Sequence, residues 1–317
     1  MIVALFIQIF YTVKMDCGAP SLKNGKDMIM TSKGSPNTGI CCNCESKYSE
    51  NDETCPACSN HVGFPNVRFS DSSENVNALI ERFLLARKSA KSRGCYKEFQ
   101  EFRKHIKKKS GVVISMPAGI FRDLIKTPNK IYRNYEQLVQ ASEISSRGAQ
   151  FDNLRHAISG CLFGSYNNKI AYGVLSLNKE GLPTYGDVFC LLRPVTIEKR
   201  TSFLEENSYR FVEKHNILSG RPVGNWATWR TKHLLALVKL ERFIEKGQKE
   251  TDWENVFFLT NGKDRNLDDF IEAHIYGSIN YSSIENAMPA PNKKLGRLEK
   301  LDIEAGMSRL EKLKEKR

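Results

Sequence analysis

The sequence predicts an α+β protein in which helices dominate the first half and strands the second. Between residues 70 and 145, apolar side chains recur every three or four positions, as on one face of a helix. Later segments are short, rich in β-branched and aromatic residues, and separated by Gly, Pro and Asn. Because strands and helices do not alternate regularly, a doubly wound parallel sheet is not expected.

The expected helices carry an apolar stripe, and two of them are followed by glycine. One begins at "SDSS", a typical helix start, and is broken by Gly94, whereas a later one ends at Gly247. Pro128 is expected at the start of another helix. The predicted helices are residues 70–92, 95–109, 118–125, 128–143, 225–247 and 292–317. The predicted strands are residues 111–117, 171–177, 185–195, 255–261 and 270–279.

The chain carries an excess of positive charge, which favours a polyanionic partner. Its 317 residues include 48 Lys or Arg and 36 Asp or Glu, which gives a net charge of +12. Ten basic residues and two glutamates lie between Arg87 and Lys109. Nucleic acid, either RNA or DNA, is the first candidate partner. An acidic membrane surface, an acidic protein or a merely solvated helix face would also fit this run.

The N-terminal residues are apolar, but the sequence predicts no membrane span. No run of about 18 apolar residues occurs, so neither a transmembrane helix nor a membrane partner is expected. The segment "MIVALFIQIFYTVKM" lacks a basic start and a small-residue cleavage site. It is either a signal anchor, a buried first strand, or an extension of the reading frame upstream of a true start at Met15.

The nine cysteines predict a metal site rather than a framework of disulfide bonds. Their number is odd, and five of them fall between residues 41 and 58. Two CxxC pairs separated by ten residues offer four thiolates to one tetrahedral Zn²⁺ ion: Cys41, Cys44, Cys55 and Cys58. Cys42 is spare, and His61 could replace a ligand in another register.

Since protein atoms fill all four positions, the zinc ion is expected to be structural and the module to be a short zinc ribbon. The free thiols fit a cytoplasmic protein. The alternative interpretation, a redox-active CxxC, lacks the strand–helix context that such motifs have.

The segment "DFIEAHIYGSI" is unusual because it places a carboxylate on an otherwise aromatic face of a strand. Side chains of a strand alternate between its two faces. One face is then apolar or small throughout, and the other carries Phe270, Glu272, His274 and Tyr276. Carboxylates are rarely buried without a partner. The residues alone therefore leave open why Glu272 lies there; a partner arginine on a neighbouring strand is one explanation.

Several short motifs follow one another in residues 147–289. They are "FG" and then "YGVL", a strand that begins "YGDV", the run "RTSF" followed by "NS", and the late "EAHIYG" strand. This outline resembles a group of ADP-ribosyltransferase-like bacterial and phage proteins. The resemblance implies a core with a split antiparallel or mixed β-sheet, which cleaves NAD at the bond between nicotinamide and ribose.

The resemblance gives Glu272 a catalytic role. Its carboxylate would accept a hydrogen bond from the 2′-hydroxyl of the nicotinamide ribose and stabilise the positive charge that develops as nicotinamide leaves. Ser202 would hydrogen-bond near the glutamate. His274 would contact the acceptor, unless it is an ordinary packed histidine.

The resemblance also implies a set of residues that bind NAD. They are Arg147, Gln150, Arg155, Tyr172, Tyr185, Arg200, Thr201 and Ser208. Arg147 is the first choice for the pyrophosphate and Arg155 the alternative, because the guanidinium fork suits phosphate oxygens. The two tyrosines would stack on nicotinamide, unless they serve only as the turn residues at which their strands begin.

Composition and motifs divide the chain into five regions, and the resemblance implies a toxin-like enzyme. The regions are an irregular leader (1–38), a zinc ribbon (39–70), a basic helical region (71–145), an ADP-ribosyltransferase-like core (146–290) and a charged C-terminal helix (291–317). The expected function is transfer of ADP-ribose from NAD to RNA or DNA, by a toxin or phage-defence effector. The alternatives are a protein acceptor, and a non-enzymatic zinc-ribbon protein that binds nucleic acid. The C-terminal helix could dock an antitoxin protein through four leucines: Leu298, Leu301, Leu310 and Leu313.

Overall fold

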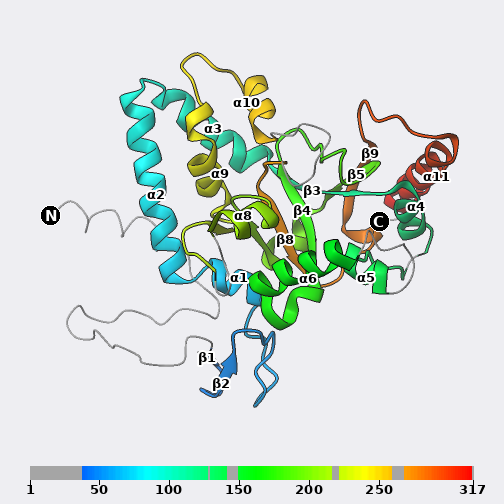
Figure 1. Ribbon diagram of the computed structural model, residues 1–317, viewed down its shortest axis with the longest axis horizontal. Coiled ribbons are helices and arrows are strands. Elements are labelled where there is room, and N and C mark those ends of the chain that lie inside the picture. The colour runs from blue at the N-terminus through cyan, green and yellow to red at the C-terminus, as the bar shows by residue number, and fades with distance from the viewer. Residues whose placement is uncertain (1–37, 128, 141–148, 216–220, 259–267, 316–317) are drawn as a thin grey trace. The chain divides into compact units, whose positions relative to one another are not determined.

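The computed structural model describes residues 38–127, 129–140, 149–215, 221–258 and 268–315. The chain divides into two compact units, and the boundary between them lies between Pro65 and Asn66 (Figure 1). The predicted leader lies outside the described residues, except for its last position.

The described part of the smaller unit, residues 38–65, buries few side chains. Its two short strands pair in antiparallel register: β1 (Thr38–Ile40) and β2 (Lys47–Ser49). Within residues 38–64, all of which are described, the buried side chains are those of Cys41 and Cys55. So short a chain cannot be stabilised by this little apolar burial. Another interaction is therefore needed to stabilise residues 38–65.

The larger unit is built on one seven-stranded sheet with the strand order β7-β6-β8-β4-β3-β5-β9. Each pairing between its strands is antiparallel. The strands are β3 (Gly111–Met116), β4 (Ile170–Ser176), β5 (Val188–Leu192), β6 (Thr201–Leu204), β7 (Trp226–Thr228), β8 (Glu272–Tyr276) and β9 (Ile284–Pro289). This arrangement confirms the predicted α+β class at the level of an antiparallel sheet with helices. Strand β3, which lies in the predicted basic helical region, belongs to the same sheet.

The helices match the sequence pattern best near the start of the larger unit. Helix α2 begins after Ser72, whose side chain accepts a hydrogen bond from the backbone of Asn75, and Gly94 with φ +73° separates it from α3. The α-helices are α1 (Pro65–Ser70), α2 (Ser73–Ser92), α3 (Tyr96–Lys109), α4 (Ala118–Lys126), α5 (Tyr135–Gln140), α6 (Ala149–Phe163), α7 (Pro194–Ile197), α8 (Ser208–His215), α9 (Lys232–Leu240), α10 (Glu250–Phe257) and α11 (Arg297–Lys314). No helix within the described ranges is long and apolar enough to span a membrane.

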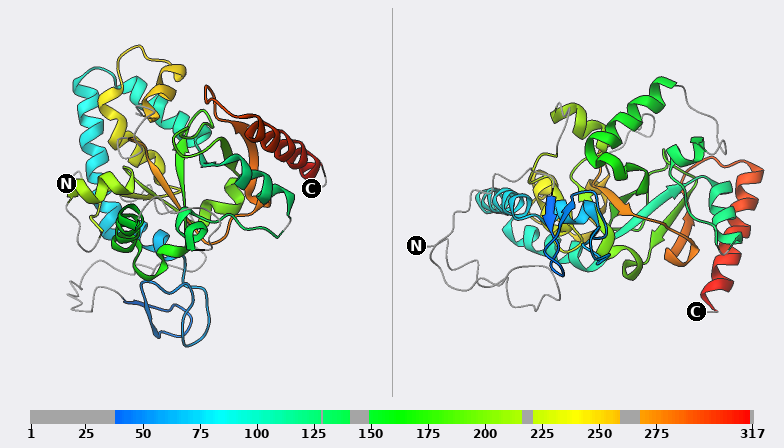
Figure 2. Two further views of the ribbon diagram at one scale, coloured as in Figure 1. Left: turned by 45° about the vertical axis from the view of Figure 1, so that its right-hand side comes forward. Right: turned by 90° about the horizontal axis from the view of Figure 1, so that it is seen from below.

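The two faces of strand β8 have different chemistry, as its sequence predicts. Ile271, Ala273 and Ile275 belong to the main hydrophobic core, to which α2, α3, α9 and α10 also contribute side chains. Glu272 and His274 alternate with them and lie on the opposite face. There, α6 and α8 approach the sheet (Figures 1 and 2). The alternation therefore puts polar side chains on the face that is turned away from the main core.

Two predicted elements differ in the structure because tertiary contacts override the local pattern. The strand predicted at residues 255–261 is, as far as it is described, mainly the end of helix α10. Here Trp253 and Phe257 pack on Phe102, with ring centroids 5.0 and 5.9 Å apart. The helix predicted at residues 225–247 opens with strand β7, which pairs with β6, and becomes helix α9 only at Lys232.

The helix predicted to begin at Pro128 begins at Tyr135 instead. Asn134 and Gln137 cap it reciprocally. The backbone N–H of Gln137 donates to Oδ1 of Asn134 (2.9 Å), and the backbone N–H of Asn134 donates to Oε1 of Gln137 (3.0 Å). This is a capping box. The spacing N-x-x-Q is therefore the sequence signal that outweighs proline as a helix start here.

The C-terminal helix α11 packs on α4 within the larger unit. Both lie side by side in Figures 1 and 2. Gly306 allows the close approach, because a Cβ atom there would lie 2.5 Å from Cε1 of Phe121. Leu310 is buried, whereas Leu298 and Leu301 are 75% and 52% exposed. Of the leucines expected to dock a partner, Leu310 is thus used inside the unit itself.

Candidate functional site

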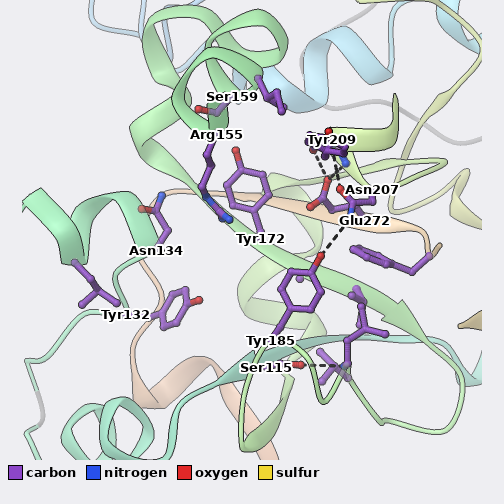
Figure 3. A pocket seen from close by; sticks show the side chains of 18 of the residues that line it. Ser115, Tyr132, Asn134, Arg155, Ser159, Tyr172, Tyr185, Asn207, Tyr209 and Glu272 are labelled. Carbon is purple, nitrogen blue, oxygen red and sulfur yellow. Dashed lines mark hydrogen bonds between the residues drawn. The ribbon is translucent and has the colours of Figure 1, made fainter. Parts of the chain in front are cut away.

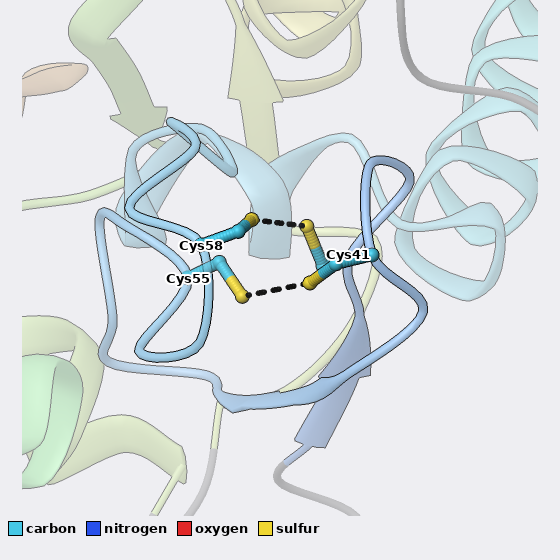
Figure 4. Close-up of side chains that lie close together, drawn as sticks. Cys41, Cys55 and Cys58 are labelled. Carbon is cyan, nitrogen blue, oxygen red and sulfur yellow. Dashed lines mark hydrogen bonds between the residues drawn. The ribbon is translucent and has the colours of Figure 1, made fainter.

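Four thiols of the smaller unit meet in an arrangement that suits one metal ion (Figure 4). The Sγ atoms of Cys41 and Cys58 are 3.7 Å apart, and those of Cys44 and Cys55 are 3.6 Å apart. All four ligand atoms lie within 4.8 Å of one another. Zn–S bonds of about 2.3 Å in a tetrahedron place the sulfurs about 3.8 Å apart. The cluster therefore fits a structural zinc site.

The two CxxC segments fold into equivalent turns. The backbone N–H of Glu45 donates to the carbonyl of Cys41, and that of Ser59 to the carbonyl of Cys55, both at 2.8 Å. Glu45 and Ser59 have φ values of +60° and +59°, so each CxxC segment reverses direction directly after its second cysteine. Two turns of the same geometry thus present two thiols each to one point.

The alternative ligands lie outside this cluster. Cys42 is exposed, and its Sγ is 3.9 Å from the side-chain amide nitrogen of Asn60. His61 uses Nδ1 to accept a hydrogen bond from the backbone of Gly63 at 3.2 Å. The four thiols that converge are the ones expected from the CxxC spacing.

The environments of the thiols favour different protonation states before metal binds. The side chain of Asn43 and the backbone of Asn60 lower the pKa of Cys58 to about 6. Burial raises the pKa of Cys55 to about 11. Because zinc binds thiolates, binding near neutral pH would release a proton from Cys55.

The polar face of the large sheet forms one wall of a cavity of about 450 Å³ (Figure 3). Strands β3, β4 and β8 and helices α6 and α8 contribute to its lining. Small-molecule sites in proteins typically measure about 300–1,000 Å³. The cavity can therefore hold a small ligand, or one part of a larger ligand.

Glu272 is fixed at this wall through one of its two carboxylate oxygens. Its Oε2 accepts hydrogen bonds from the backbone N–H of Ser208, at 2.8 Å, and from the Ser208 hydroxyl. Nε2 of His274 lies 3.2 Å from the same oxygen. No hydrogen bond from the described residues reaches the second oxygen, Oε1. The partners of Glu272 are therefore a serine and a histidine, not the arginine considered as an alternative.

The start of helix α8 favours a carboxylate at this place. Ser208 is its first residue, so the backbone N–H that binds Glu272 is one of the donors that a helix leaves unpaired at its N-terminus. Asn207 precedes the helix, and its Oδ1 accepts a hydrogen bond from the backbone of Tyr209 at 2.9 Å. Asn207 thus caps the N-terminus of α8, and the Glu272 carboxylate binds there.

His274 lies behind the carboxylate and has no exposed surface. Its ring centroid is 4.7 Å from that of Phe163, 5.5 Å from that of Tyr172 and 5.6 Å from that of Trp226. Nδ1 is buried and has no hydrogen-bond partner among the described residues. A neutral ring that donates to Glu272 therefore carries its proton on Nε2. This position suits orientation of Glu272, rather than the contact with an acceptor that was expected from the sequence.

Three further candidates of the sequence interpretation do not line the cavity. Ser202 pairs with His274 in the register of β6 and β8, and its buried Oγ accepts a hydrogen bond from Asn66 at 3.1 Å. Thr201 donates its hydroxyl to a backbone carbonyl four residues earlier, at 2.7 Å. Arg200 donates to three backbone carbonyls, one of them on β8. These contacts hold β6 against its neighbours.

The structure brings another group of the candidates together around the cavity. They are Glu272, Ser208, Arg155, Tyr172 and Tyr185. Figure 3 shows Arg155 of α6 beside the ring of Tyr172, and Cζ of the arginine is 5.5 Å from the ring centroid. Tyr185 accepts a hydrogen bond from the side-chain amide of Asn207 at 3.1 Å. A cation and two aromatic rings therefore share the cavity with the carboxylate.

Two candidates cannot be placed, and several lining residues were not foreseen. Arg147 lies outside the described residues, and so does the side chain of Gln150. The polar residues that sequence reasoning missed are Ser115, Tyr132, Arg133, Asn134, Ser159 and Tyr209. Of these, only Asn134 had a local signal, the capping box described above. The others reach the cavity through the packing of elements that are distant in the sequence.

No protein-family model matches the sequence, and no curated protein matches it either. The function is therefore inferred from the geometry of the site and from the residues in it.

Proposed function

We propose that the protein is an NAD-dependent ADP-ribosyltransferase with Glu272 as its catalytic carboxylate. The observation that carries the proposal is the asymmetric environment of this side chain. Oε2 is held by Ser208 and His274, whereas Oε1 receives no hydrogen bond from the described residues in a side chain that lines the cavity. A carboxylate fixed in this way is ready to interact with a substrate group without first reorganising.

The proposed reaction needs a negative charge at such a place. The bond between C1′ of the ribose and the nicotinamide nitrogen breaks, and nicotinamide leaves as a neutral molecule with the bonding electron pair. Positive charge then develops on the ribose, and Glu272 would stabilise it while accepting a hydrogen bond from the 2′-hydroxyl. A nucleophile of the acceptor forms the new bond to C1′, and its proton passes to solvent.

The remaining lining residues suit the other parts of a dinucleotide. Arg155 and Arg133 supply positive charge for the pyrophosphate. Tyr172 and Tyr185 supply aromatic surface for a planar ring. Each of these roles is assigned from the chemistry of the side chain, and substitution of that residue tests it.

The charge of the chain favours nucleic acid, RNA or DNA, as the acceptor. The net charge is +12, and ten of the 48 basic residues lie between Arg87 and Lys109, in α2, α3 and the turn between them. An enzyme of this kind would act in the cytoplasm as a toxin or phage-defence effector, and a producing cell would need an antitoxin partner. In this scheme the zinc ion stabilises the smaller unit and takes no part in the chemistry.

The test is transfer of label from NAD that carries it in the adenosine part. Purified protein is incubated with labelled NAD and, separately, with total RNA, DNA and a protein lysate. Label that enters one fraction with the wild type, but not with Glu272→Gln, supports the proposal and identifies the acceptor class. Label in the protein fraction alone would replace nucleic acid by a protein acceptor. If no fraction is labelled and NAD stays intact, a non-enzymatic zinc-ribbon protein that binds nucleic acid becomes the better account.

A further inference from the structure

Helices α2 and α3 bring four cationic side chains together outside the cavity. They form the α2–α3 basic cluster: Arg87, Lys91, Arg103 and Lys107. Arg87 donates from Nε to the hydroxyl of Tyr96 at 3.2 Å, and Nζ of Lys91 lies 5.0 Å from the centroid of the same ring. Cζ of Arg103 lies 5.2 Å from the centroid of Phe83. The rings of Tyr96 and Phe83 thus contact three of the four cations.

The spacing on each helix keeps these cations in line. Arg87 and Lys91 are four residues apart on α2, and so are Arg103 and Lys107 on α3. Side chains four apart lie on the same face of a helix, about 6 Å from one another along its axis. Lys107 is exposed, as is Lys91, whereas the two arginines are half-buried.

The cluster has no carboxylate partner within the part of the chain that the structure describes. No acidic group of the described residues lies within 4.0 Å of its four members, although Arg82 of α2 and Arg93, the C-cap of that helix, both form ion pairs with glutamates. Burial and the charge of Arg87 lower the pKa of Arg103, and burial and the charge of Arg103 lower that of Lys107. The fold therefore holds like charges close together without compensating them.

The recessed end of the cluster has an unfilled hydrogen-bond donor. Nε of Arg103 is buried and has no partner among the described residues, while its Nη2 lies 3.5 Å from Nε2 of His233. Burial, Lys107 and Arg103 lower the pKa of His233 to about 3, so this ring is neutral and adds no charge. A buried guanidinium donor without an acceptor is costly, and an anion bound at the accessible part of the side chain would favour its charged state.

We propose that the α2–α3 basic cluster binds the phosphate backbone of a single nucleic-acid strand. Phosphates recur along a strand at intervals comparable with the spacing of the cations on each helix. A flexible strand can also reach the half-buried arginines, whereas the flat surface of an anionic membrane would meet mainly the two exposed lysines. The inference names the partner of the proposed enzyme, but binding to this cluster requires neither NAD nor Glu272.

The test measures how binding of the full-length protein depends on salt. A labelled single-stranded RNA of about 16 nucleotides is titrated by fluorescence anisotropy between about 0.05 and 0.3 M salt. The double variant Lys91→Gln/Lys107→Gln removes two exposed charges and leaves the half-buried arginines in place. Lys126→Gln/Lys300→Gln removes two exposed charges elsewhere, on α4 and α11, and is the matched control.

The proposal predicts a local effect of known size. Each phosphate contact contributes about 0.7 to the slope of log K against log salt, so loss of two contacts lowers the slope by about 1.4 and weakens binding about tenfold at 0.15 M salt. The control variant should bind as the wild type does. Equal losses in the two variants, or no loss in either, would overturn the proposal. So would a cluster variant that loses binding to anionic lipid vesicles but keeps its affinity for RNA.

Discussion

The smaller unit should depend on zinc, and neighbouring cysteines allow a sharp test. Cys44 and Cys42 are two residues apart and both exposed, but only Cys44 has its Sγ in the cluster. Cys44→Ser therefore removes a ligand, and Cys42→Ser removes a thiol of the same accessibility that is not a ligand. Because Cys41, Cys55 and Pro65 are the buried residues between positions 38 and 65, the described part of this unit offers no hydrophobic core that would compensate for loss of the metal.

The magnitude follows from four equivalent ligands. Structural zinc contributes about 10–16 kcal/mol in small zinc modules, so one of four thiolates accounts for about 2.5–4 kcal/mol. Since about 1.4 kcal/mol is a factor of ten, Cys44→Ser should weaken zinc binding about 10²–10³-fold. Cys42→Ser should leave the affinity unchanged.

The assay is competition for zinc with a chromogenic chelator, combined with limited proteolysis of residues 38–65. The wild type and Cys42→Ser should retain one zinc ion per chain and resist cleavage. Cys44→Ser should lose its zinc to the chelator and be cleaved within this unit. If the two variants lose zinc equally, or if the zinc-free wild type resists the protease as well as the zinc-bound form, the proposed coordination is refuted.

Three further predictions concern the larger unit. His274→Gln keeps a hydrogen-bond donor near the position of Nε2, whereas His274→Asn places its amide nearer Nδ1. The Gln variant should therefore release nicotinamide about 10–100-fold faster than the Asn variant. Equal rates in two variants of equal thermal stability would refute the orienting role of His274. His233 is buried, and its pKa is about 3 in the folded state against 6.5 in the unfolded state. Between these two values only the unfolded state binds the proton, so the stability of the protein decreases as the pH is lowered, by about 2 kcal/mol at pH 5. Urea unfolding at pH 7 and pH 5 should show this loss in the wild type and less of it in His233→Gln; identical losses would count against it. Gly186→Ala would place a Cβ 2.3 Å from the backbone nitrogen of Met116 and should cost about 1–3 kcal/mol in urea unfolding. Gly160→Ala, inside helix α6, meets nothing within 4 Å and should instead stabilise the protein by about 0.5–1 kcal/mol; a loss of stability in both variants, or in neither, would count against the steric argument.

The features that the sequence could predict depend on local spacing. The CxxC pairs identify the four candidate metal ligands, because the turn that brings two thiols together is formed by a few consecutive residues. The alternation in β8 separates Glu272 from the core side chains because the period of a strand does not depend on its partners. Helices α2 and α3 are recognised by their apolar stripes for the same reason.

The features that the sequence could not predict depend on contacts over long separations. Ser208 binds Glu272 across 64 residues, and the depth at which His274 is buried follows from rings on three other elements. The sequence predicts a helix where strand β7 lies, and the pairing of β7 with β6 outweighs the helical pattern around it. Arg200 and Thr201 lie in the "RTSF" motif and were expected to bind NAD, but their side chains donate hydrogen bonds to backbone carbonyls instead.

The most direct test of the central claim is the rate at which purified protein releases nicotinamide from NAD, with nucleic acid and lysate supplied as acceptors. Glu272→Gln keeps the size of the side chain and removes its charge, while Glu285→Gln makes the same change at an exposed position on β9. If Glu272 is the catalytic carboxylate, the wild type and Glu285→Gln should release nicotinamide, and Glu272→Gln should release it about 10²–10³-fold more slowly, which corresponds to about 3–4 kcal/mol of transition-state stabilisation. Equal rates in all three proteins, or intact NAD with the wild type under every condition, would contradict this claim.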